Sequence, residues 1–184
     1  PEVIAEVKPF EDLHGVTIPV IAAGGIYTGE DISKFLRLGA AGVQMGSRFV
    51  TTDECDASIE FKQTYIDATE DDLVVIKSPV GMPGRALRNQ FLDDVSGGKR
   101  KPYKCPYHCI KTCDYKESPY CIFFALMNAQ RGKLKHGFAF AGTNAYRATE
   151  IISVHELMET LVLEYNEAEV RLEETAGSTS NSSV

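Results

Sequence analysis

Two short apolar runs, separated by an amphipathic stretch, dominate the first fifty residues of the chain. The runs Ile18–Ala23 and Ala41–Met45 each lead into a turn that contains glycine. Between them, residues 29–38 place apolar side chains at helical spacing, and Thr28 with Asp31 forms a capping-box pattern that begins a helix. A buried strand, a helix and a second buried strand in this order predict a βαβ unit, which requires two parallel strands.

The two glycine turns predict a binding site for an anion. Gly24 and Gly25 follow the first strand, and Gly46 with Ser47 follows the second. Because both turns lie at the carboxyl ends of parallel strands, they share the edge of the sheet where α/β folds bind ligands. Glycine carries no Cβ, so backbone N–H groups can close around a phosphate. One such turn can be only a tight turn, but two on consecutive strands favour a phosphate site, with the Ser47 hydroxyl as a further ligand.

The rest of the pattern is mostly helical. It predicts helices over residues 1–14, 53–69, 85–95 and 121–131, and a strand over 73–76. In the helix over 53–69, Ile59 and Tyr65 are among the residues expected to face inward. The glycine-punctuated segment 137–148 is expected to return towards the phosphate site.

A last helix is predicted to begin at Ser153, where Glu156 completes a capping box. Its apolar residues have the spacing of a buried face: Val154, Leu157, Met158, Leu161, Val162 and Tyr165. From about Glu167 the sequence becomes acidic and then rich in serine, which is typical of a disordered tail. We therefore expect three parts: βα units over 1–76, a helical or irregular extension over 77–166, and a disordered tail over 167–184.

Composition narrows the function classes. The chain has 184 residues and a formal net charge of −7, and its pI is near 5.1. This excess of acidic residues argues against binding to nucleic acid, because such binding needs a basic protein surface. No apolar stretch is long enough to span a bilayer, and no signal-peptide pattern opens the chain. Five cysteines, an odd number without a secretory pattern, indicate reduced thiols and a cytoplasmic protein.

Four of the cysteines form a second sharp pattern, in which Cys105, Cys109, Cys113 and Cys121 lie within seventeen residues and His108 lies among them. Thiolates are the preferred ligands of iron–sulfur clusters and of zinc, so this loop is a candidate metal site and a candidate structural or interaction module. The spacing matches neither a zinc knuckle nor a ferredoxin run, and a loop of ordinary reduced cysteines is the alternative interpretation.

Two arginines and the histidines complete the candidates. Arg85 and Arg88 lie where a helix is predicted to begin, so they can meet an anionic ligand, or they can be ordinary ion-pair partners. No histidine is paired with a nucleophile in the sequence. The catalytic residues therefore stay unknown at this point.

Several segments together resemble a known family, the flavin-dependent nitronate monooxygenases (formerly 2-nitropropane dioxygenases) and the related enoyl-acyl-carrier-protein reductase II enzymes. The segments are IPVIAAGGIYTGEDI, GAAGVQMGSRFVTTDEC and PVGMPGRALRNQF. CPYHCIKTC with PYCI, and GFAFAGTNAYR, resemble the carboxyl-terminal region of a bacterial branch. The resemblance covers nearly all of residues 1–165.

The resemblance implies an α/β fold: the carboxyl-terminal part of a TIM (β/α)8 barrel, with its last two strands, followed by a mostly helical extension. It also implies non-covalent FMN, whose phosphate is held by the turns after those strands. Carried onto this sequence, the phosphate ligands are Ala23, Gly24, Gly25, Gln44, Met45, Gly46 and Ser47. The family's flavin-stacking residues and catalytic histidine belong to earlier barrel segments that this chain lacks. The chain, which begins without methionine, is therefore expected to be an inactive fragment.

The implied reaction is the oxidation of alkyl nitronates with dioxygen. The alternative within the family is reduction of an enoyl thioester by NADH or NADPH through FMN. The residues present do not separate these two reactions, because both use the same phosphate turns. Association of copies of the chain is a further expectation, since a short parallel sheet has exposed edges.

Overall fold

The computed structural model describes residues 1–101, 104–105 and 107–180, with side chains up to Thr175. The chain divides into two compact units, one formed by Pro1–Gly46 together with Ile152–Val184 and the other by Ser47–Ile151. These boundaries differ from the predicted parts 1–76 and 77–166. The difference arises because the last helix packs on the first βαβ segment rather than on the residues that precede it.

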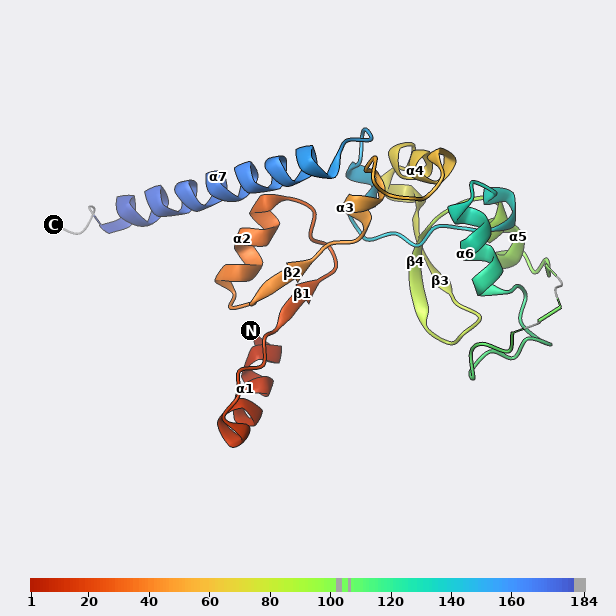
Figure 1. The fold of residues 1–184 in the computed structure, drawn as a ribbon, viewed down its shortest axis with the longest axis horizontal. Coiled ribbons are helices and arrows are strands. Elements are labelled where there is room, and N and C mark those ends of the chain that lie inside the picture. Colours follow the sequence, from red (N-terminus) through yellow and green to blue (C-terminus); the bar gives the residue numbers. More distant parts are fainter. Residues whose placement is uncertain (102–103, 106, 181–184) are drawn as a thin grey trace. The chain divides into compact units, whose positions relative to one another are not determined.

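The first unit contains the predicted βαβ arrangement. Its elements are α1 (Glu2–His14), β1 (Ile21–Ala23), α2 (Gly29–Arg37), β2 (Gly42–Gln44) and α7 (Val154–Ser180) (Figure 1). Strands β1 and β2 pair in parallel, with Ala22 opposite Val43. The capping box forms as expected: Asp31 N–H donates to Thr28 Oγ1 at 3.2 Å, and Thr28 N–H donates to Asp31 Oδ2 at 3.1 Å. The local sequence signals therefore determine where α2 begins.

Helix α7 lies along α2 (Figure 1). Leu161 and Ala168 are buried on α7, and Gly29 on α2 lies so close to the α7 backbone that a Cβ there would overlap it. The predicted disordered tail over 167–184 is corrected for the described part, because α7 continues as a helix to Ser180. The reason is a contact that composition does not reveal: Glu169 accepts hydrogen bonds from α2. Residues 181–184 lie outside the described residues.

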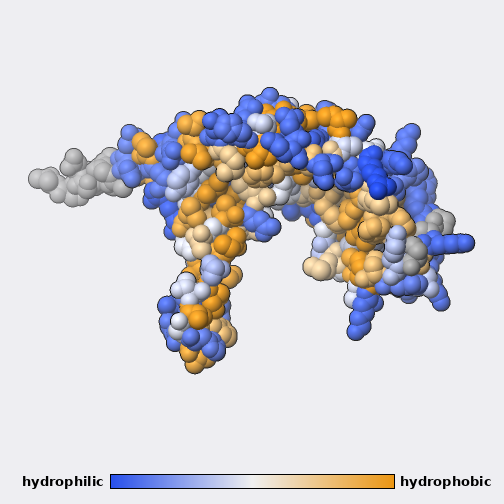
Figure 2. Space-filling view, viewed as in Figure 1, coloured by the Kyte–Doolittle hydropathy of each residue, from blue (hydrophilic) through white to orange (hydrophobic). Residues whose placement is uncertain are grey.

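Strands β1 and β2 are more exposed to solvent than we expected from the apolar sequence runs that contain them. Ile21 is 51% exposed, and on α1 the side chains of Phe10 and Leu13 are 58% and 76% exposed. Figure 2 shows apolar residues at the surface along α1. A two-stranded sheet with one helix on it leaves apolar surface in contact with water. On α7 the predicted apolar face is likewise only partly buried, since Met158 and Val162 are about half exposed.

The second unit holds an antiparallel hairpin surrounded by helices. Its elements are α3 (Ser47–Val50), α4 (Ile59–Ile66), η1 (Glu70–Asp72), β3 (Leu73–Lys77), β4 (Pro83–Leu87), α5 (Gln90–Ser96), α6 (Ile122–Gln130), η2 (Leu134–His136) and η3 (Ala145–Arg147). The predicted strand over 73–76 and the helix over 121–131 are confirmed. The helix predicted over 53–69 is shorter, and Ile59 is 59% exposed rather than inward-facing.

The helix predicted over 85–95 is wrong in its first half, because residues 83–87 form strand β4. Its partner on one side is β3, where Val75 lies opposite Arg85. On the other side, Leu87 N–H donates to the carbonyl of Ala139 at 3.0 Å, and Ala141 N–H donates to the carbonyl of Arg85 at 3.0 Å. These pairings on both sides outweigh the helix propensity of the sequence. Helix α5 then begins after Asn89, whose side chain accepts a hydrogen bond from Leu92 N–H.

Two apolar clusters form the core of the second unit. One groups Phe91, Tyr120 and Phe138 between the hairpin, α5 and α6. The other surrounds Tyr65 on α4, whose hydroxyl donates to the carbonyl of Phe140 at 2.6 Å. Desolvation by burial raises the pKa of Tyr65, so the phenol stays neutral and acts as a donor. Both clusters pack against the segment 138–141, which fixes its position beside β4.

Candidate functional site

The structure brings the two predicted phosphate turns together at one edge of the first unit. Ala23 and Gln44 are opposite each other in the β1–β2 register, so the turns that follow are neighbours. Gly24 and Gly25 adopt φ values of 90° and 72°, in the left-handed region that favours glycine. A Cβ built at Gly24, Gly25 or Gly46 meets nothing within 4 Å. A side chain added at any of these three positions would therefore extend into open space.

The amino end of α2, by contrast, is capped by the protein itself. The N–H groups of Tyr27 and Thr28 donate to Asp31 Oδ2, at 2.9 and 3.1 Å, and Gly29 N–H donates to Glu164 Oε2 at 2.7 Å. These donors, which a helix often offers to a bound anion, are directed at carboxylates. These three N–H groups at the start of α2 are therefore already paired within the protein.

Ser47 begins α3 in the second unit, directly after Gly46. Its Oγ accepts a hydrogen bond from Gly142 N–H at 2.7 Å. A Cβ at Gly142 would lie 3.1 Å from that oxygen, so this close approach favours glycine. Segment 137–148 thus returns to Ser47, as the sequence predicted. Since the Ser47 oxygen acts as an acceptor in this bond, the hydroxyl still has a proton to donate.

Arg85 and Arg88 have different surroundings. Neither begins a helix, since Arg85 lies within β4 and Arg88 lies just after it. Arg88 Nε donates to Asp93 Oδ1 at 2.9 Å. Arg88 is therefore an ordinary ion-pair partner, which was one of the two interpretations of the sequence. Arg85 Nη1 donates to Thr143 Oγ1 at 2.8 Å. The sequence predicted that segment 137–148 would return towards the site, but it did not show that Gly142 would contact Ser47 or that Thr143 would contact Arg85.

The cysteine loop does not form a metal centre in the described part of the chain. Cys105, Cys109, Cys113 and Cys121 are all free thiols, and they line a cavity of about 240 Å³ together with aromatic and aliphatic side chains. Among the described residues, no three histidine, cysteine or acidic side chains are grouped so as to hold a metal ion. The predicted iron–sulfur or zinc site is therefore not supported, and the alternative interpretation as ordinary reduced cysteines is the better one. Residue 106 of this loop lies outside the described residues.

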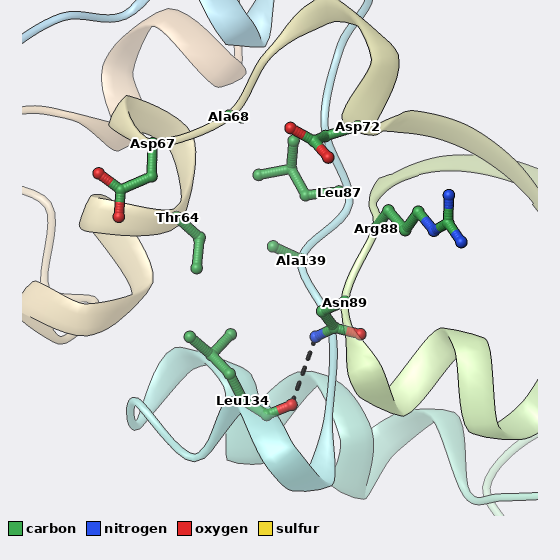
Figure 3. Close-up of a pocket in the computed structure, with 9 residues that line it drawn as sticks. All are labelled: Thr64, Asp67, Ala68, Asp72, Leu87, Arg88, Asn89, Leu134 and Ala139. Carbon is green, nitrogen blue, oxygen red and sulfur yellow. Dashed lines mark hydrogen bonds between the residues drawn. The ribbon is translucent and has the colours of Figure 1, made fainter.

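A polar cavity of about 200 Å³ lies in the second unit, lined by Thr64, Asp67, Ala68, Asp72, Leu87, Arg88, Asn89, Leu134 and Ala139 (Figure 3). Its polar side chains are already engaged with the protein. Asn89 Nδ2 donates to the carbonyls of Leu134 and Gly137, and hydrogen bonds from Thr69 lower the pKa of Asp72. The cavity therefore offers no catalytic constellation of its own.

No helix in the described residues is both long and apolar enough to cross a membrane.

Comparison with known proteins gives a consistent result. The family model described as nitronate monooxygenase matches residues 3–164. A Staphylococcus aureus (strain JH9) protein named "Probable nitronate monooxygenase" is 42% identical over 81 residues, which cover 44% of this chain and 23% of that protein. A Mycobacterium tuberculosis protein named as a (3aS,4S,5R,7aS)-5-hydroxy-7a-methyl-1-oxo-octahydro-1H-indene-4-carboxyl-CoA dehydrogenase is 41% identical over 86 residues, or 47% of this chain and 24% of that protein.

Two solved structures resemble most of the chain. FabK from Thermotoga maritima has a TM-score of 0.69 and 30% identity, and the match covers 88% of this chain and 49% of FabK. Nitroalkane oxidase from Streptomyces ansochromogenes has a TM-score of 0.63 and 28% identity, covering 86% of this chain and 42% of the oxidase. The chain thus spans about half the length of these structures and about a quarter of the curated relatives. Because the family model covers most of its length, the chain belongs to the nitronate monooxygenase family of oxidoreductases.

Proposed function

We propose that this chain carries the phosphate-binding part of an FMN-dependent oxidoreductase. In this proposal β1 and β2 are the last two strands of a (β/α)8 barrel, and their turns hold the FMN phosphate through residues 23–25 and 44–47. The supporting observation is the pairing of Ala23 with Gln44, which makes two open glycine turns neighbours at the carboxyl edge of parallel strands.

The proposed reaction is the oxidation of an alkyl nitronate with dioxygen, as the family name suggests. FMN supplies the electron transfer, and the residues of this chain bind and orient it. A second candidate, reduction of an enoyl thioester with NADH or NADPH, is supported by the similarity to FabK over 88% of the chain. In either case we propose that the groups contacting the substrate belong to barrel segments outside this chain.

The first test of the proposal is a binding titration of the full chain with FMN and, separately, with riboflavin, followed by flavin fluorescence. If the turns hold the phosphate, FMN binds and riboflavin, which lacks the phosphate, binds much more weakly. Equal affinity for the two flavins, or no binding of FMN, would overturn the proposal.

A matched pair of variants locates the site. Gly46→Val places a side chain in the open space at the second turn, where nothing in the protein obstructs it, so we expect the fold to persist and FMN binding to be lost. Ala41→Val adds similar bulk at an exposed position just before β2 and should leave FMN affinity unchanged. In a protein that also carries the remaining barrel segments, nitronate-dependent oxygen uptake and enoyl-thioester-dependent NAD(P)H oxidation then separate the two reactions.

A further inference from the structure

Four cysteines of the second unit line one cavity, and the proposed FMN site does not use them. Cys105, Cys109, Cys113 and Cys121 all contribute to the wall of this cavity, whose volume is about 240 Å³. All four are free thiols. Within the described part of the chain they do not form a metal-binding group. Their common position therefore points to thiol chemistry that needs no metal.

The loop that carries three of these cysteines is folded against the start of α6. Cys113 N–H donates to the carbonyl of Ile110 at 3.1 Å, which closes a turn in the loop. The ring of Tyr107 packs edge-on against Phe123 of α6, with 5.6 Å between the ring centroids. Cys121 is the N-cap residue of α6, and its side chain makes no capping hydrogen bond. The fold thus gathers thiols from the loop and from the helix around one space.

Thiols that share a small cavity are suited to form a disulfide. A disulfide forms only between cysteines whose Cα atoms come within about 7 Å of each other, so a common cavity favours a pair. The four thiols also differ in access to solvent. Cys109 is exposed, whereas the other three are partly buried. Since oxidation of cysteine follows exposure, a dissolved oxidant should react with Cys109 first.

We propose that Cys109 and a second cysteine of this cavity form a reversible disulfide when the protein meets a hydroperoxide. The thiolate of Cys109 attacks the peroxide, so that an S–O bond forms, the O–O bond breaks and hydroxide leaves, which takes up the thiol proton. The second thiol then attacks the sulfenic sulfur, forms the S–S bond and releases water. With hydrogen peroxide, two thiols lose two electrons and two protons, and the peroxide becomes two water molecules. This site is independent of the proposed FMN site.

The test treats the full chain with hydrogen peroxide and then counts its thiols after unfolding. We expect the wild type to lose two of its five thiols and to regain both with dithiothreitol. Non-reducing electrophoresis should show no covalent dimer. Trypsin divides the loop into peptides 105–111, 112–116 and 117–131. Mass spectrometry should therefore find peptide 105–111, which holds Cys109, either linked to one of the other two or lighter by two hydrogen atoms.

Cys55 is the matched control. It is partly buried in the same unit, as three of the cavity cysteines are, but it is not among the residues that line the cavity in the described structure. Its tryptic peptide should stay reduced, and Cys55→Ser should oxidise as the wild type does. Cys109→Ser should lose the disulfide, and an unchanged circular dichroism spectrum verifies that this variant is folded.

Several results would overturn the proposal. They are retention of all five thiols, a disulfide that includes Cys55, oxidised Cys109 without a thiol partner, or an undiminished disulfide in Cys109→Ser. The wild type unfolded in urea gives one more comparison. If peroxide produced the same disulfide there, the pairing would follow from closeness in sequence and not from the cavity, and the structural argument would be refuted.

Discussion

Gly29 is the position where the packing of α7 on α2 can be tested most directly. A Cβ at Gly29 would overlap the carbonyl of Leu161 and the amide of Tyr165, and it would lie 2.7 Å from Glu164 Cβ. The first two atoms are backbone, so α7 must move away to accept even a methyl group. That movement would also break the 2.7 Å hydrogen bond from Gly29 N–H to Glu164. Gly29→Ala is therefore expected to separate the two helices.

The expected magnitude follows from these two losses. Overpacking costs about 1–3 kcal/mol, and losing a hydrogen bond to a charged group costs about 1.5–3 kcal/mol. Both effects are relieved by the same movement of α7 away from α2, so they do not add fully. We therefore expect the packing of α7 on α2 to be destabilised by about 2–5 kcal/mol in total. Helix propensity alone predicts the opposite sign, because alanine in a helix is favoured over glycine by about 1 kcal/mol.

Amide hydrogen exchange of the full chain is the appropriate assay, because it reports on each unit separately. In Gly29→Ala, protection should fall in α2 and α7 and stay unchanged in the second unit. Lys34→Ala, an exposed change on the same helix, should leave all protection in place. Protection in α2 and α7 equal to or greater than that of the wild type would refute the packing argument.

Three further predictions concern other contacts. Gly137→Ala should destabilise the second unit by about 3 kcal/mol or more in urea unfolding, because its Cβ would overlap a backbone carbonyl of α6. Tyr65→Phe should cost about 1–2 kcal/mol in the same measurement, because it leaves the buried carbonyl of Phe140 without its donor, and an unchanged midpoint would contradict this. A hydrogen bond from Arg37 lowers the pKa of Glu169, so its contribution to α7 packing should be complete above pH about 4.5 and be lost as pH falls through the lowered pKa. Glu169→Gln should remove that pH dependence of α7 exchange protection.

Local signals in the sequence were sufficient to predict the elements of the βαβ segment and their order. The Thr28–Asp31 capping box and the two glycine turns depend on residues a few positions apart, and the structure places them as predicted. Strand β4 was predicted as helix because Arg85, Ala86 and Leu87 are good helix formers. Their strand conformation comes from partners at 73–77 and 139–141, and the sequence does not show which segments will pair.

The candidate site, like the fold, could be predicted only where it depends on residues close together in the sequence. The open turns could be predicted because glycine itself marks them. The hydrogen bonds of Ser47 with Gly142 and of Arg85 with Thr143 could not, since they join residues 95 and 58 positions apart. The extension of α7 beyond Glu167 was missed for a related reason. An acidic composition argues for disorder unless the carboxylates have partners, and those of Glu169 lie on α2.

The discontinuous first unit has a consequence for biosynthesis. The second unit is a continuous stretch of 47–151 inserted between the two parts of the first. The hydrogen bond from Gly29 to Glu164 spans 135 residues, so α2 cannot acquire this partner until α7 has been synthesised. At about 5–20 residues per second, that delay lasts several seconds or more. During this time the side of α2 that α7 covers in the folded protein stays exposed to solvent.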